Sequence, residues 1–178
     1  MIAKIINAIT IIRILLAAII FILLYFGDQY LFALILFFIA GLTDYFDGFL
    51  ARRYSATSEL GEILDPIADK ILIVFLLFGL ALNLSSYLIG FIGSIIITRE
   101  IWVSALRDLN ARKNNTNATK VTYLAKIKTS VQLFTISVYL IGLAFSMMLL
   151  IVLGDILLIA SMLITVYTGY IYTINTFK

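Results

Sequence analysis

The sequence predicts an all-α polytopic membrane protein with six transmembrane helices and a polar cavity at the cytoplasmic side. Of its 178 residues, 63% are hydrophobic and only 13% are charged, whereas a soluble domain carries about 25% charged residues. The apolar residues form long runs separated by short polar breaks, and a helix needs about 20 such residues to cross a bilayer. Six spans use most of the chain, so we expect residues 1–178 to form a single membrane domain.

The placement of positive charge predicts the topology. The breaks near Gly27, near Asn83 and near Gly154 contain no lysine or arginine, so all 13 positive residues fall on one side of a six-helix protein. By the positive-inside rule, both termini then face the cytoplasm. Basic proteins also bind nucleic acid, but a chain this apolar favours anionic lipid headgroups and phosphate substrates instead. Cysteine is absent, so disulfide and redox chemistry are excluded.

The first expected helix spans residues 5–26 and carries one polar face. Asn7, Thr10 and Arg13 follow each other at steps of three, which places them along one side of a helix. One interpretation is an arginine that extends to the headgroups beside two polar neighbours. The other is that this face closes one wall of the cytoplasmic cavity.

Four aspartates mark the second and third expected helices, over residues 30–52 and from a cap at Thr57 or Ser58 onward. Asp44 and Asp47 come at the end of one helix, and Asp65 and Asp69 at the beginning of the next. An unpaired carboxylate inside a membrane costs about 2–3 kcal/mol or more. Because the chain has no histidine or cysteine, the expected counter-charge is a hard divalent cation, with space for two ions about 3.5–4 Å apart. The alternative is a set of helix-end carboxylates solvated by headgroup water.

The remaining helices carry a second cluster of charges and two further expectations. Arg99 and Arg107 are two turns apart on the fourth helix. Lys126 and Lys128 open the fifth, at about 200° to each other, so only one of them is expected to face the cavity. The alternative is that these residues only signal topology. We also expect a kink or a local loosening at Pro66, the only proline, if its helix starts before Gly61. The last two helices are expected over about residues 121–148 and 151–177, with Gly154-Asp155 near the outer turn between them.

Three motifs carry a resemblance to a known family. The pattern Asp-x2-Asp-Gly-x2-Ala-Arg-x8-Gly-x3-Asp-x3-Asp, from Asp44 to Asp69, resembles the signature of the CDP-alcohol phosphatidyltransferases at every fixed position. The N-terminal Asn-x2-Thr-x2-Arg is similar to that of many members, with Ile6 where proline is usual. Residues 98–107 and 125–132 resemble the phosphatidylglycerophosphate synthases, with Ala125 in place of a glycine.

The resemblance implies a reaction and a role for each candidate residue. Glycerol 3-phosphate would attack CDP-diacylglycerol and release CMP, in the cytoplasmic (inner) membrane of a bacterium, and the enzyme would be a homodimer. Two Mg²⁺ or Mn²⁺ ions would be bound by Asp44, Asp47, Asp65 and Asp69, with Asp69 also accepting the proton of the attacking hydroxyl. The donor would lie against Gly48, Ala51, Arg52 and Gly61. The acceptor phosphate would be bound by Arg99, Arg107 and Lys126, and Asn7, Thr10 and Arg13 would support the site.

Two other functions stay open at this point. Within the family, the acceptor could be inositol phosphate, or uncharged inositol or serine. Outside the enzymes, a six-helix protein with four membrane carboxylates could be a cation carrier. A carrier built from inverted repeats would show related broken helices in both halves, and the acidic motif occurs in only one half of this chain.

Overall fold

The computed structural model describes residues 2–27, 29–54, 59–113 and 123–178 and contains six helices in those ranges. They are α1 (Ile2–Phe26), α2 (Tyr30–Tyr54), α3 (Glu59–Asn83), α4 (Tyr87–Arg112), α5 (Tyr123–Ala144) and α6 (Met148–Phe177). The described part of the chain forms no strand, so the all-α prediction is confirmed. The expected caps at Thr57 and Ser58 lie outside the described residues.

Five of the helices are long and apolar enough to cross a membrane: α1, α2, α4, α5 and α6. The sixth, α3, is 25 residues long and carries Asp65, Asp69 and Lys70 in its first half. It continues as a helix through Pro66, and packs against α1, α4 and α5. Among the described helices, α3 is therefore the one that is not a candidate span by its length and composition.

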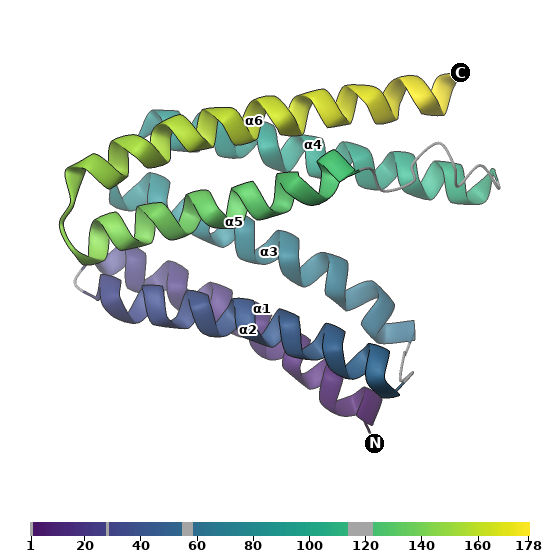
Figure 1. The fold of residues 1–178 in the computed structure, drawn as a ribbon, viewed down its shortest axis with the longest axis horizontal. Coiled ribbons are helices and arrows are strands. Elements are labelled where there is room, and N and C mark those ends of the chain that lie inside the picture. Colours follow the sequence, from purple (N-terminus) through teal and green to yellow (C-terminus); the bar gives the residue numbers. More distant parts are fainter. Residues whose placement is uncertain (1, 28, 55–58, 114–122) are drawn as a thin grey trace.

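The helices run up and down, and both chain ends lie at the same end of the bundle (Figure 1). α2 ends and α3 begins at this end, and the last turn of α4 lies here too. The first turn of α5 faces the same way but lies further back along the bundle. α1 packs against α2 and α3, whereas α6 packs against α4 and α5. Contacts of α3 with α4, and of α2 with α5, join the two groups.

The apolar core and the buried polar groups occupy different parts of the bundle. The core includes Ile20, Leu24, Leu76 and Leu80, on helix turns away from the chain ends. Beside it, Asn83 Nδ2 donates to the Leu24 carbonyl at 2.8 Å and to the Tyr30 hydroxyl at 3.0 Å. The buried charged side chains, Arg13, Asp47, Arg99 and Lys128, lie outside this apolar cluster.

The turn between the last two helices is not at Gly154-Asp155, and that prediction is wrong. The helices break at residues 145–147, where Ser146 takes a φ of 54°. Gly154 lies inside α6 against the ring of the buried Tyr139, whose hydroxyl donates to Asp155 Oδ1 at 2.6 Å. The glycine allows a close helix contact here, and the aspartate accepts a hydrogen bond, so neither marks a turn.

Replacing Gly154 by alanine is predicted to destabilise the bundle. The added Cβ would lie 2.7 Å from a carbon of the Tyr139 ring, and this ring is fixed by its burial and by Asp155. Overpacking of this kind costs about 1–3 kcal/mol, so the thermal unfolding midpoint in detergent should fall. Gly41→Ala is the matched control, because its Cβ would meet nothing within 4 Å and alanine favours a helix. An equal fall in both variants would contradict the packing explanation.

Candidate functional site

Arg13 lies at the centre of the carboxylates that the sequence singles out. Its guanidinium is 1% exposed; Nη1 lies 2.9 Å from Asp44 Oδ1 and 2.8 Å from Asp69 Oδ1, and Nη2 pairs with Asp47 Oδ2. The three carboxylates come from α2 and α3, and the cation comes from α1. The chain therefore supplies a counter-charge of its own, where the sequence suggested only bound cations.

The same face of α1 also reaches the fourth aspartate. Thr10 is buried and donates to Asp65 Oδ1 at 2.9 Å, one turn before Arg13. Asn7 is half-buried one further turn away. The structure thus brings Thr10 and Arg13 together with all four aspartates, and the shared face predicted from the three-residue spacing is what makes this possible.

The four carboxylates are the kind of ligand that a hard divalent cation prefers. All of their donors are oxygens, and the Asp44 and Asp69 side chains remain 57% and 48% exposed, which suits Mg²⁺ or Mn²⁺. Among the described residues, however, no three carboxylates converge as a group that could hold a metal ion. The Arg13 guanidinium lies among three of them, so a cation bound here would draw these carboxylates away from Arg13.

The residues expected at the donor are only partly described. Gly48 is half-buried near the end of α2, and Gly61 is buried near the start of α3. The side chains of Ala51 and Arg52 lie outside the described residues. The two glycines therefore lie in the same two helices as the aspartates, as the motif spacing requires.

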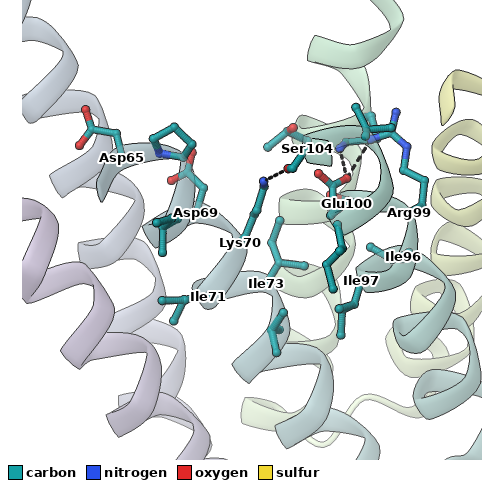
Figure 2. Close-up of a pocket in the computed structure, with 18 of the residues that line it drawn as sticks. Asp65, Asp69, Lys70, Ile71, Ile73, Ile96, Ile97, Arg99, Glu100 and Ser104 are labelled. Carbon is teal, nitrogen blue, oxygen red and sulfur yellow. Dashed lines mark hydrogen bonds and ion pairs between the residues drawn. The ribbon is translucent and has the colours of Figure 1, made fainter. Parts of the chain in front are cut away.

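A second cluster of charges forms where α4, α5 and α6 meet. Glu100 Oε1 accepts from Arg99 Nη1 at 3.0 Å and also pairs with Lys128 Nζ, and all three side chains are largely buried. Arg99 Nη2 donates to Thr168 at 2.7 Å. Figure 2 shows Arg99 and Glu100 directed toward each other on one side of the cavity.

Arg99 and Arg107 share a face, as their spacing predicts. Their guanidinium carbons lie 5.9 and 5.8 Å from the centre of the Tyr172 ring, within the range of a cation–π contact. The Lys126 side chain lies outside the described residues, whereas Lys128 is buried against Glu100. The structure therefore places Lys128 in this cluster and leaves the expectation for Lys126 untested.

One cavity of about 790 Å³ contacts both sets of charges. Its lining includes Asp65 and Asp69 from α3, and Arg99, Glu100, Arg107 and Lys128 from α4 and α5. A second cavity, of about 290 Å³, is lined by Arg13, Asp44 and Asp69 together with apolar residues of α2 and α5. Asp69 borders both cavities, and its side chain is half exposed.

Sequence reasoning missed Glu100, Lys70 and Ser104 as members of this site. Lys70 follows Asp69 and donates across to Ser104 Oγ on α4 (Figure 2). A local signal existed for Glu100, because it is an acidic residue directly beside Arg99 in an otherwise basic stretch. For Lys70 and Ser104, 34 positions apart, the sequence offers no such signal.

Comparison with known proteins agrees with these motifs. A family model described as CDP-alcohol phosphatidyltransferase matches residues 4–167. A CDP-diacylglycerol–glycerol-3-phosphate 3-phosphatidyltransferase of Blochmanniella floridana is 39% identical over 144 residues, which cover 80% of this chain and 74% of that protein. Proteins of the same name from Wigglesworthia glossinidia brevipalpis and Escherichia coli K12 are 40% and 34% identical over 62% and 59% of this chain. These two matches span 61% and 58% of the relatives' own lengths, less than two thirds.

Replacing Arg13 by glutamine is predicted to destabilise the protein even without substrate. Removing one partner of a buried ion pair costs about 3–5 kcal/mol, and we expect the lower end because Asp44 and Asp69 are half exposed. Thermal unfolding in detergent with EDTA measures the loss. Arg112→Gln is the control, since it breaks an exposed pair with Asp108 that contributes little. If the two variants unfold at the same temperature, Arg13 is not the counter-charge described above.

Proposed function

The chain belongs to the CDP-alcohol phosphatidyltransferase family, and from this premise we propose that it transfers the phosphatidyl group of CDP-diacylglycerol to glycerol 3-phosphate. The products are phosphatidylglycerophosphate and CMP. The single cavity that borders both the aspartates and the Arg99–Arg107 cluster carries the proposal. The names of the relatives, which are 34–40% identical, support the choice of acceptor.

The residues divide between the two substrates by their charge. Arg99, Arg107 and Lys128 supply the donors that bind the acceptor phosphate, since charge-assisted hydrogen bonds to phosphate are the stronger ones; Lys126 remains a further expected ligand. Gly48 and Gly61, with Ala51 and Arg52, bind the cytidine and pyrophosphate of the donor. The acceptor then lies with its phosphate at α4 and α5 and its free hydroxyl toward α3.

Asp69 is the proposed base. Its carboxylate borders both cavities, so it can meet the hydroxyl of an acceptor on one side and the donor on the other. The hydroxyl oxygen forms a bond to the phosphorus that carries the lipid, its proton moves to Asp69, and the bond to CMP breaks. Arg13 donates to Asp69 at 2.8 Å and so holds the carboxylate in place before the ions bind. Proton transfer to a positioned carboxylate is general base catalysis.

The proposal includes two Mg²⁺ or Mn²⁺ ions bound by Asp44, Asp47, Asp65 and Asp69. When bound, they supply positive charge next to the pyrophosphate and the departing CMP oxygen. The oxygen donor set supports this part of the proposal. Arg13 then serves as the counter-charge before the ions bind.

The acceptor is tested by offering four candidates to purified protein with radiolabelled CDP-diacylglycerol. We expect labelled product with glycerol 3-phosphate, and far less with inositol phosphate, inositol or serine, because only the first combines a phosphate with a small polyol that fits beside Asp69. Thin-layer chromatography identifies the product. If the protein clearly prefers another acceptor, the phosphatidyl transfer reaction stands but glycerol 3-phosphate is not its acceptor. A protein that transfers to none of them, while binding cations, would favour the carrier.

Metal dependence is tested with two substitutions and a chelator. Asp44→Asn and Asp65→Asn should abolish transfer while the protein still inserts and purifies, since asparagine keeps the size and removes a ligand charge. EDTA should do the same to the unaltered protein, and Mg²⁺ or Mn²⁺ should restore it. Asp108→Asn, at an exposed position of α4, is the matched control and should stay within a few-fold of full activity. If Asp44→Asn and Asp65→Asn remain as active as this control, the two-metal proposal is wrong.

We further propose that both termini face the cytoplasm of a bacterial inner membrane. The chain has no cysteine, so single cysteines report sidedness without background. A cysteine at Lys178 should react with an impermeant maleimide only after the membrane is opened, and one at Gln29, at the opposite end (Figure 1), should react from outside. The reverse pattern would refute the orientation. The homodimer implied by the resemblance stays a prediction, which mass measurement of the purified detergent complex would test.

A further inference from the structure

Lys70 lies between the two halves of the larger cavity. It follows Asp69 on α3, its side chain is half-buried, and its ammonium donates to Ser104 Oγ on α4. Figure 2 shows Lys70 between the aspartates on one side and Ser104, Glu100 and Arg99 on the other. The residue therefore lies on the path between the proposed base and the proposed phosphate ligands.

Lys70 differs from the buried cations of this cavity because its partner carries no charge. Arg99 and Lys128 both pair with Glu100, whereas Lys70 has a neutral hydroxyl as its partner. Among the side chains that the structure describes, no carboxylate forms an ion pair with Lys70 or with Arg107. An ammonium inside a membrane protein is costly when no anion pairs with it, so an anionic ligand that pairs with Lys70 would stabilise this position.

The charges match those of a phosphate monoester. Lys70 and Arg107 contribute two unit charges that no described carboxylate offsets, and both side chains line the same cavity. A phosphate monoester carries about 1.5–2 negative charges at pH 7. Its oxygens accept hydrogen bonds as the Ser104 hydroxyl does, so a bound phosphate can replace or share that partner.

We propose that Lys70 is a substrate-binding residue that contacts the phosphate of the acceptor and selects for phosphorylated acceptors. This inference rests on the proposed function for the identity of the acceptor, but not for the binding of a phosphate group. The simplest competing explanation is that the bond from Lys70 to Ser104 only joins α3 to α4.

Binding of inorganic phosphate in EDTA separates these two explanations without any turnover. Phosphate should raise the unfolding temperature of the unaltered protein, and Lys70→Met should lose most of this increase. Ser104→Ala removes the same hydrogen bond but keeps the ammonium, so it should retain the increase. Lys113→Met, which removes a charge from the exposed end of α4, should also retain it. If phosphate does not stabilise the unaltered protein, or if Lys70→Met responds as the unaltered protein does, the proposal is wrong.

Kinetics then assign the phosphate to the acceptor. Lys70→Met should raise the KM for glycerol 3-phosphate by about 10- to 150-fold, the range expected for losing one charge-assisted contact, with the KM for CDP-diacylglycerol within about two-fold. Lys70→Arg should recover part of the loss. A rise in the donor KM instead would overturn the assignment to the acceptor. If the unaltered protein binds phosphate through Lys70 but does not use glycerol 3-phosphate, the proposed function fails and the phosphate site remains.

Discussion

The ion pairs of Arg13 are the interaction on which the rest of the site depends. One buried guanidinium from α1 contacts carboxylates of α2 and α3, and Thr10 adds a bond to Asp65. Apolar packing alone does not fix how far one helix slides along another, because it has little directionality. The guanidinium of Arg13, which donates in fixed directions to three carboxylates, does fix this position along the helix axis. The relative positions of the first three helices, and therefore of all four aspartates, are defined by this contact.

The arrangement also brings opposite charges to the two sides of one cavity. Asp65 and Asp69 of α3 lie on one side, the cations of α4 and α5 lie across from them, and Lys70 lies between. A reaction between two anionic substrates has to overcome their repulsion, which is about 4 kcal/mol for unit charges 4 Å apart at an effective dielectric constant of 20. Cations placed along the path between the substrates reduce that repulsion before any bond is made.

Much of this could be predicted from the sequence, because helical periodicity is a local property. Composition predicts the helical fold class. Residue spacing predicts the polar face of α1 and the helix face that Arg99 and Arg107 share. The contacts that the sequence did not predict join residues that are far apart in the chain. Glu100 and Lys128 are 28 residues apart, and nothing before the helices pack indicates that they meet. The prediction for Gly154 failed for the same reason. This glycine packs against Tyr139, and the presence of a glycine in a sequence does not show whether it forms a turn or allows a close approach.

The position of Arg13 has a consequence for how the chain is made. α1 leaves the ribosome before α2 and α3, and its arginine has none of its carboxylate partners until the end of α2 follows. Asp47 comes 34 residues later, which at about 5–20 residues per second is a delay of about 2–7 s. During that time the guanidinium must extend to the headgroups and water, so α1 begins at a shallower depth or a different tilt. Its final position in the membrane is reached only when the aspartates arrive, and cross-linking of ribosome-arrested chains of increasing length would time that step.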